Sequence, residues 1–526
     1  MKLKEFLQLK STKDKAYLEF TCSIVEQGRF RGLGITALLY FSFLKLPFSF
    51  PVVSDLARSI QGLLLGYIVE SQTTSPADKR SPGIAEAPSG FTGALNPNTN
   101  KVFDYIIVGS GPGAAVAALK INPTSSVLVI EQGGLPRTPS SKHHTLAHVR
   151  NDFYKGGQEI ALSPWFPQFA QASVFGGGSE VNSGLYHDLP NYLIDEFLVA
   201  AGLAHVTYLK SQDKVKKLLQ ISQMKVAPQD SPIARGAEEL GYEYQNILRW
   251  RTYKKNSEFT QHGMIDVAWN HLSKNANFQF ELNSRVHKID TSKKNSIKVT
   301  FIDSSGGSIE VFTQNLIMAA GAIQTPRLLC QGGLLDWGVT NFQWHPMVRT
   351  IIDTSPSDLG LHDVDPFQSW TSDRKFKFGS AVSTPGLLAM NLARIPTVDE
   401  LPRLRSIYGS FVSHGKGGLI PQTEMPYYLP SVEDRKNLQE IRSRIENVVL
   451  ASGATFANPN QRVKKGLSTV HIFGTLPVDS GVFIHGTSRL KVEPRIQVSD
   501  GSLLPFGPGV NPQGVIMSLC DALVTS

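Results

Sequence analysis

Phe103-Asp-Tyr-Ile-Ile-Val-Gly109-Ser-Gly111-Pro-Gly113-Ala114 is the stretch that decides the fold. Residues 103–108 are apolar and have strand character, the glycines suit a tight turn, and residues 114–119 (AAVAAL) are typical of a helix. In such a turn Gly109 permits the bend, Gly111 lets the backbone approach a pyrophosphate, and the helix N-terminus offers free N–H groups to the phosphates. We therefore predict an α/β, Rossmann-like nucleotide-binding unit.

An acidic residue follows at the expected spacing. The next apolar run, residues 127–130 (VLVI), ends in Glu131, 22 residues after Gly109. A carboxylate there can accept hydrogen bonds from both ribose hydroxyls, although a surface carboxylate at a strand end has the same appearance. The third glycine of the fingerprint is replaced by Ala114, which is still small enough for close helix packing. We predict that the nucleotide is held by Gly109, Gly111, Pro112, Gly113, Ala114 and Glu131.

A second glycine-rich loop indicates which dinucleotide is bound, FAD or a nicotinamide dinucleotide. Residues 175–184 (FGGGSEVNSG) include Gly177 and Gly178 and carry the polar amide of Asn182. A simple nicotinamide-binding domain has no use for this loop. FAD is therefore the predicted cofactor.

Composition limits the remaining alternatives. The chain has 526 residues, 41% hydrophobic and 18% charged, which predicts two domains or one large domain with an insertion. The net charge is +8, but Lys and Arg are scattered, so we expect a solvated basic surface and no nucleic-acid partner. Three distant cysteines match neither a disulfide framework nor a metal site.

The first hundred residues leave two interpretations open. Apolar runs at 32–44 and 60–69 are shorter than the roughly 18 residues that a membrane-spanning helix needs, and no export signal precedes them. Residues 1–70 are either a helical extension packed on the main body or helices lying in a membrane interface. Residues 71–100 have linker composition. We expect a cytoplasmic protein, peripherally associated with a membrane under the second interpretation.

From about residue 101 to the C-terminus the chain resembles the glucose-methanol-choline (GMC) family of FAD-dependent oxidoreductases. Five motifs occur in the order of that family. They are GSGPGA at 109–114 with Glu131, the loop at 176–184, the segment AAGAIQTP at 319–326, His471-x-x-Gly474-Thr475, and Asp500-Gly-Ser with Asn511-Pro512. In the third, an apolar strand meets Gly321 and then a proline-led helix.

The resemblance implies a catalytic pair. His471 stands at the family's base position, and histidine can take a hydroxyl proton near neutral pH. Asn511 stands at the second position, where an amide can donate a hydrogen bond to the developing alkoxide. Asn511-Pro512 also reads as a helix start, with Asn as the N-cap, and both interpretations can hold together.

Further cofactor contacts follow from the same resemblance. Val286 stands at a backbone contact to the adenine edge. Asp500 is expected near the ribityl or pyrophosphate group, although Asp-Gly is also a common turn pair. The full set of cofactor contacts implied beyond the first cradle is Gly177, Gly178, Asn182, Val286, Asp500, Gly501, Pro512 and Gln513.

The expected architecture is a discontinuous FAD-binding domain with an α+β substrate domain on an antiparallel sheet. The FAD-binding domain would comprise residues 101–190, 270–335 and 466–526, and the substrate domain residues 191–269 and 336–465. Within the latter we predict a strand at 348–352 and a helix at 432–450. Phe367, Trp370, Phe376 and Phe378 suit either a core or an apolar pocket.

The implied function is oxidation of an alcohol to an aldehyde or ketone. The small-molecule alcohol and the electron acceptor, whether oxygen, a quinone or a protein, stay open. An alternative on the same fold is a non-redox or photochemical flavoenzyme, such as a hydroxynitrile lyase or a fatty-acid photodecarboxylase. No metal is expected.

Overall fold

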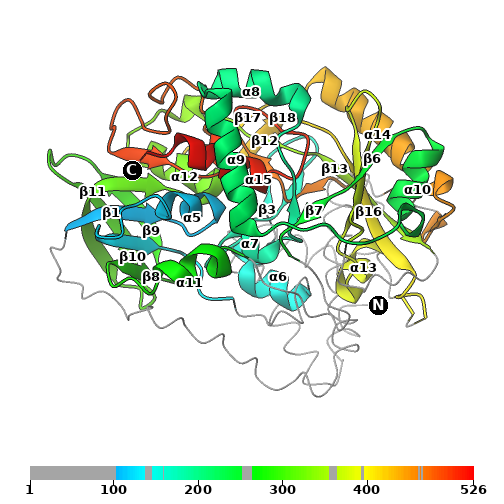
Figure 1. Ribbon diagram of the computed structural model, residues 1–526, viewed down its shortest axis with the longest axis horizontal. Coiled ribbons are helices and arrows are strands. Elements are labelled where there is room, and N and C mark those ends of the chain that lie inside the picture. Colours follow the sequence, from blue (N-terminus) through cyan, green and yellow to red (C-terminus); the bar gives the residue numbers. More distant parts are fainter. Residues whose placement is uncertain are drawn as a thin grey trace, which may run out of the picture.

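The computed structural model describes residues 102–136, 145–157, 159–251, 263–354, 364–392, 396–397, 399–459, 462–463 and 466–525. The predicted extension at 1–70 and linker at 71–100 lie outside these residues. In Figure 1 two sheets stand side by side, one at the left and one at the right, with the long helix α9 (His205–Leu219) between them.

The first sheet confirms the predicted strand, turn and helix. β1 (Val102–Val108) pairs in parallel with β2 (Val127–Ile130) and with β11 (Ser308–Met318), and the turn after β1 leads into α5 (Pro112–Ala118). The order is β8-β2-β1-β11-β10-β9, with β22 beside β11. The other strands are β8 (Phe278–Glu281), β9 (Arg285–Asp290), β10 (Ile297–Ile302) and β22 (Ile496–Val498).

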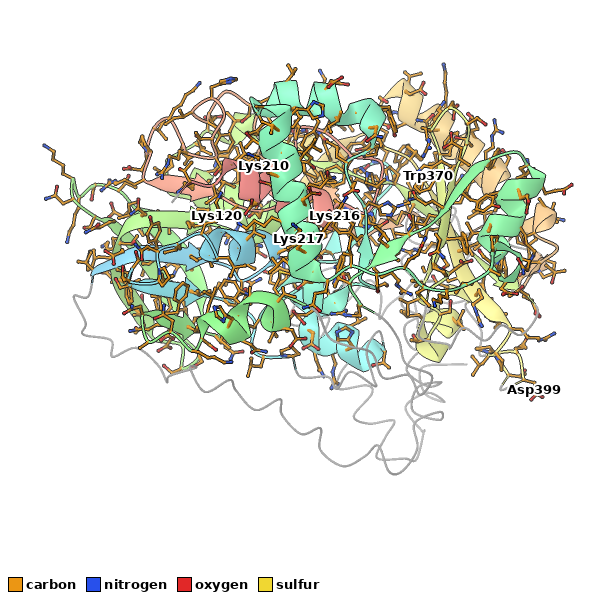
Figure 2. The ribbon with its side chains drawn as sticks, in the orientation of Figure 1. Lys120, Lys210, Lys216, Lys217, Trp370 and Asp399 are labelled. Atoms are coloured by element: carbon orange, nitrogen blue, oxygen red, sulfur yellow. The ribbon has the colours of Figure 1, made fainter. Side chains whose placement is uncertain are left out.

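Helices α5, α9 and α15 (Gln513–Leu523) pack together at this sheet. Lys120, which follows α5, is labelled in Figure 2. Its ammonium donates to the carbonyl oxygens of Asp521 and Val524 at 2.6 and 2.7 Å. The ammonium thereby ties the end of the chain to the nucleotide-binding unit.

Helix α12 (Gly321–Gln331) corrects one prediction. It begins at Gly321, with Pro326 in its interior, so the expectation of a proline-led helix is wrong. Proline lacks the N–H that would donate to the carbonyl of Ala322 four residues earlier. The hydroxyl of Thr475 donates to that carbonyl instead. One residue of the His471-x-x-Gly474-Thr475 motif therefore completes a helix of the first domain.

The second sheet is mainly antiparallel, as the resemblance implies. Its order is β3-β4-β20-β13-β16-β15-β14-β6, with β19 beside β13. Helices α10 (Pro232–Glu239) and α14 (Val432–Ala451) pack together on it (Figure 1). Its strands are β3 (Glu159–Ile160), β4 (Gln168–Phe169), β6 (Glu243–Asn246), β13 (Met347–Asp353), β14 (Phe367–Trp370), β15 (Lys377–Ala381), β16 (Leu404–Ser410), β19 (Thr455–Phe456) and β20 (Ser468–Thr469).

Core packing accounts for the four aromatic residues of the predicted substrate domain. Phe367, Phe376 and Phe378 lie in the apolar core between this sheet and its helices, and Trp370 lies in the core of the first domain. None of them lines the main cavity of the described chain. Their strand spacing therefore reflects packing.

Some segments pack in a different domain from the one that the predicted boundaries assign to them. α8 (Ile194–Ala201) and α9, expected in the substrate domain, place Phe197, Tyr208 and Val215 in the first core, because α9 packs on α15 and α8 packs on α9. Conversely, β3, β4 and β20 belong to the second sheet. Which core a segment joins depends on contacts with residues far away in the sequence. Composition along the chain does not reveal such contacts.

Shorter elements complete the described chain. No single helix within it is long and apolar enough to cross a membrane, although the bent pair Asn191–Ala201 and His205–Leu219 meets the criteria of length and composition. The shorter helices and strands are α6 (Leu146–Asp152), α7 (Gly178–Val181), α11 (Asn270–Leu272), α13 (Pro385–Leu392), β5 (Leu185–Tyr186), β7 (Leu248–Arg249), β12 (Gln343–Trp344), β17 (Lys416–Leu419), β18 (Pro426–Leu429) and β21 (Ile472–Phe473).

Candidate active site

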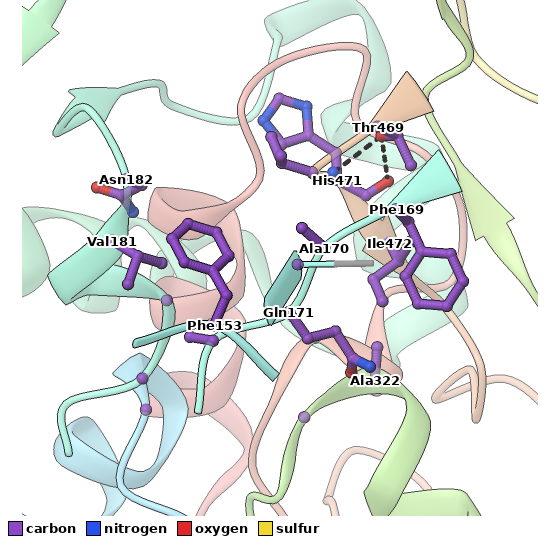
Figure 3. A pocket seen from close by; sticks show the side chains of 18 of the residues that line it. Phe153, Phe169, Ala170, Gln171, Val181, Asn182, Ala322, Thr469, His471 and Ile472 are labelled. Carbon is purple, nitrogen blue, oxygen red and sulfur yellow. Dashed lines mark hydrogen bonds between the residues drawn. The ribbon is translucent and has the colours of Figure 1, made fainter. Parts of the chain in front are cut away.

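A large cavity in the described part of the chain joins the two domains. Its volume is about 930 Å³, and its lining runs from the glycines after β1 through the loop at 176–184 to His471 and Asn511. Figure 3 shows Asn182 and Val181 on one side of this space, with His471 and Thr469 on another. Within the described chain, the cavity therefore brings the predicted nucleotide cradle and the predicted catalytic pair together.

Glycine is required in the cradle because other backbone crowds it. A Cβ on Gly109 would lie 2.2 Å from the carbonyl oxygen of Ala319, and one on Gly113 would lie 2.0 Å from that of Ser499. Gly111 is different, because its nearest neighbour would be 4.0 Å away, at Gly177. A side chain at Gly111 would instead occupy space on the cavity wall.

The second glycine-rich loop lies directly against the first. Gly177 has φ +61°, and a Cβ there would lie 2.7 Å from the Cα of Gly111. Gly178 faces open space in the cavity lining. Asn182, at the end of α7, donates to the side-chain oxygen of Gln513 at 2.6 Å, which links this loop to the start of α15.

The carboxylate of Glu131 lies at the end of β2, as predicted. It accepts hydrogen bonds from the backbone N–H of Ser110 at 3.0 Å, from the Ser110 hydroxyl at 2.7 Å and from the N–H of Gly133 at 2.8 Å. Burial raises the pKa of Glu131, and these hydrogen bonds oppose that rise. Glu131 thus holds the turn after β1 and still lines the cavity.

These residues fit FAD. The cavity wall carries no side chain at three glycines, which leaves room there for the chain of the cofactor. These glycines are Gly111, Gly178 and Gly321. Pro112, Val286 and Gly501 line the same space, while Ala114 is fully buried beneath it. Arg285 and Arg327 also line the cavity and were missed at the sequence level, since scattered arginines carry no local signal.

Asp500 has a structural function that the turn alternative anticipated. One carboxylate oxygen accepts from the N–H of Gly321 at 2.9 Å and from the Thr325 hydroxyl at 2.5 Å. The other accepts from the N–H and hydroxyl of Ser502 at 2.9 and 2.6 Å. Because protein donors occupy both oxygens, Asp500 fixes the turns at Gly321 and Gly501 at the edge of the cavity.

His471 is held by its own backbone and by a strand pair. Thr469 accepts a hydrogen bond from the N–H of His471 at 2.9 Å and donates to its carbonyl oxygen at 3.3 Å (Figure 3). The side chain is 9% exposed. Burial, followed by the neighbouring His345 and Lys377, holds the pKa of His471 well below its usual value. The ring is therefore neutral and able to accept a proton.

His345 is the partner of that ring. β21 pairs with β12, Ile472 opposite Trp344, which places the two histidines side by side, with their Nδ1 atoms 3.3 Å apart. Burial lowers the pKa of His345 to about 3. Two neutral rings share one proton in such a contact. When His471 donates from Nδ1, its Nε2 is left with a free lone pair.

Asn511 lines the cavity with its amide held from behind. Its Oδ1 accepts from Lys377 Nζ at 2.6 Å and from Gln368 Nε2 at 3.3 Å. In its ammonium form Lys377 is only a donor, so this contact holds the oxygen of the amide toward Lys377. The Nδ2 group is thereby left for another partner.

The start of α15 settles the alternative for Asn511-Pro512. The N-cap is Pro512, no side chain caps the helix, and the helix itself begins at Gln513. The expectation that Asn511 is the N-cap is therefore wrong, because its amide is engaged by Lys377 instead.

Lys377 and His345 are functional residues that sequence reasoning missed or set aside. Lys377 lies on β15, is 5% exposed and has its pKa lowered to about 7 by burial. His345 precedes Pro346, and this pair of residues carries no catalytic signal of its own. The sequence motifs locate His471 and Asn511 but not the residues that contact them. Those partners, His345 and Lys377, are brought to the site by the folding of distant strands.

A family model and a related protein sequence both match this chain to GMC oxidoreductases. Residues 103–347 match the family model described as GMC oxidoreductase. The "uncharacterized GMC-type oxidoreductase y4nJ" of Sinorhizobium fredii is 24% identical over 488 residues, covering 82% of this chain and 95% of that protein. An "(R)-mandelonitrile lyase-like" protein of Arabidopsis thaliana is 23% identical over 334 residues, or 58% of each chain.

A solved structure shares the fold. The crystal structure of pyridoxine 4-oxidase from Mesorbium loti superposes with a TM-score of 0.62 at 15% identity, covering 80% of this chain and 98% of that one. At this identity the similarity concerns architecture alone.

Proposed function

We propose that this chain, which matches the GMC oxidoreductase family model through residues 103–347, oxidises the CH–OH group of a small molecule to an aldehyde or ketone. Its cofactor is FAD. When bound, FAD supplies the acceptor for the hydrogen that leaves the carbinol carbon with its electron pair. The observation that carries the proposal is the neutral His471 at the end of the cavity that the nucleotide cradle opens into.

His471 acts as the base. Its Nε2 takes the hydroxyl proton of the alcohol, and its Nδ1 donates to Nδ1 of His345 as the ring becomes charged. Burial of both rings excludes water from this contact. His345 is thus a positioning residue that selects the tautomer of the base.

Asn511 stabilises the alkoxide that forms. Lys377 and Gln368 fix its oxygen, so its Nδ2 hydrogens are available to donate to the substrate oxygen. The positive charge of Lys377, transmitted through this amide, also favours the negative charge that develops.

An isotope effect tests the proposal. Primary alcohols deuterated at the carbinol carbon should be oxidised several-fold more slowly than the unlabelled alcohols in single-turnover measurements, because the C–H bond breaks. The measurement is the rate of flavin absorbance loss after rapid mixing without oxygen. Turnover of alcohols with equal rates for both isotopes and no flavin reduction would contradict C–H oxidation.

The pH dependence should report Lys377. Its pKa is lowered to about 7, so it is charged below that pH and neutral above it. Because the charged form assists alkoxide formation, we expect kcat/KM to fall as the pH rises through about 7. His471 stays neutral throughout this range, since its pKa lies well below 6.5.

Two variants check that assignment. Lys377→Met should be less active and should lose the fall near pH 7, whereas Lys377→Arg should move the fall to higher pH because a guanidinium stays charged. A wild-type fall that persists unchanged in Lys377→Met would assign it to another group.

The lyase relative favours one second candidate. A hydroxynitrile lyase of this fold would use the same neutral His471 to take the proton of a cyanohydrin, with no flavin reduction. Release of cyanide from mandelonitrile, absent in His471→Ala, would support this function. The deuterium experiment distinguishes the two, because cyanohydrin cleavage leaves the carbinol C–H bond intact.

A further inference from the structure

The second sheet presents a polar face to the cavity. Residues opposite one another in an antiparallel pair point to the same side. Arg349 pairs with Tyr408, which pairs in turn with Gly379, and both Arg349 and Tyr408 line the cavity. Lys377 pairs with Trp370 in the adjacent row. The alternate residues, Val348, Phe378 and Ile407, face the apolar core behind the sheet.

The guanidinium of Arg349 has no acidic partner among the described residues. Its Nε donates to the Ser468 hydroxyl at 2.9 Å, and one Nη lies 3.9 Å from the sulfur of Met347. Burial lowers the pKa of Arg349, and Tyr408 is the neighbour that opposes this effect. Within the described chain no ion pair offsets the burial of this charge.

The cavity lining has few negative charges. Among the described residues only Glu131 and Asp500 contribute carboxylates, and protein donors already occupy both of them at the nucleotide end. A buried cation without a counter-charge is costly unless a ligand supplies that charge. The part of the cavity beside Arg349 is therefore complementary to an anion.

Arg349 lies close to the catalytic base. Its charge contributes to lowering the pKa of His471, and its partner Ser468 is three residues before His471. Three residues span at most about 10 Å. Arg349 and His471 also line the same cavity, so one small molecule bound there can contact both residues.

We propose that the alcohol substrate carries a carboxylate, which binds to the free edge of the Arg349 guanidinium while the hydroxyl lies at His471. The two Nη groups form a planar donor pair that matches the two oxygens of a carboxylate. The Tyr408 hydroxyl, which accepts from Gln368 at 3.3 Å, has a proton to donate to the same group. This substrate class rests on the proposed alcohol oxidation.

The test compares matched neutral and charged probes on the FAD-loaded enzyme. Benzoate and benzamide report binding by calorimetry, and 4-(hydroxymethyl)benzoate and 4-(hydroxymethyl)benzamide report turnover. A charge-assisted hydrogen bond is worth about 10- to 100-fold in affinity, so we expect the carboxylates to be preferred by that factor in both assays.

Three variants assign the preference to Arg349. Arg349→Met should bind and oxidise both members of each pair equally, and Arg349→Lys should keep part of the preference. Arg444→Met removes the same charge from α14, where Arg444 pairs with Glu440, and should behave as wild type. The wild-type comparison needs no variant, so it decides the matter even where Arg349→Met does not fold.

The outcomes separate this inference from the proposed function. Equal use of carboxylate and amide by the wild type, or an unchanged preference in Arg349→Met, would overturn the inference while alcohol oxidation stands. Loss of FAD from Arg349→Met, with no carboxylate preference in the wild type, would assign Arg349 to the cofactor and overturn it too. Benzoate binding that depends on Arg349 without oxidation of any alcohol would support the anion site and contradict the oxidase.

Discussion

His471→Ala is expected to lower the rate of alcohol oxidation by about 10²- to 10⁴-fold, the usual contribution of a general base. Lost proton transfer is the reason, because no other neutral ring among the described residues faces the cavity from the same strand pair. The backbone contacts of residue 471 with Thr469 and His345 do not involve its side chain, so FAD binding and folding should persist.

His287→Ala is the matched control. His287 is exposed on β9, and its replacement should leave the rate of flavin reduction unchanged. The measurement is the anaerobic single-turnover rate, with the absorbance spectrum confirming that FAD is bound. A His471→Ala enzyme that reduces its flavin at the wild-type rate would remove His471 from the mechanism.

The second large effect comes from two neighbouring glycines. Gly113→Ala would place a methyl group 2.0 Å from the carbonyl oxygen of Ser499, where backbone cannot give way cheaply. We expect a loss of about 3 kcal/mol in stability, seen as a lower Tm or as insoluble protein. The result would follow from the contact between α5 and the segment after β22.

Gly111→Ala should separate cofactor binding from folding. Its Cβ would find only the Cα of Gly177 at 4.0 Å, so the fold should persist, but the methyl group would occupy the cradle. We expect a Tm close to that of the wild-type apoprotein together with strongly weakened FAD binding in a fluorescence titration. Equal FAD affinity in Gly111→Ala, or equal stability in Gly113→Ala, would contradict the arrangement of the cradle.

The nucleotide-binding unit could be predicted because its signals are local. The strand at Val127–Ile130, the turn from Gly109 and the helix Gln513–Leu523 each follow from a short run of residues and its neighbours. The same is true of the 20-residue helix α14, whose capping box at Ser431 and Asp434 marks its start.

The rest of the site depends on contacts between distant segments. His345 meets His471 through the pairing of β12 with β21, and Lys377 reaches Asn511 across the boundary between the two domains. Thr475 replaces a hydrogen bond that Pro326 cannot make, 149 residues away. Contacts between residues so far apart produce no periodic pattern in the sequence. The sequence alone therefore locates only one residue of each contact.

The most direct test of alcohol oxidation is an anaerobic absorbance titration of the FAD-loaded protein with sterols, long-chain alcohols, sugars, amino alcohols and hydroxy acids. We predict that one class bleaches the visible flavin band in wild type and that His471→Ala shows the bound band but bleaches far more slowly. A flavin that stays oxidised with every alcohol would contradict the proposed oxidation.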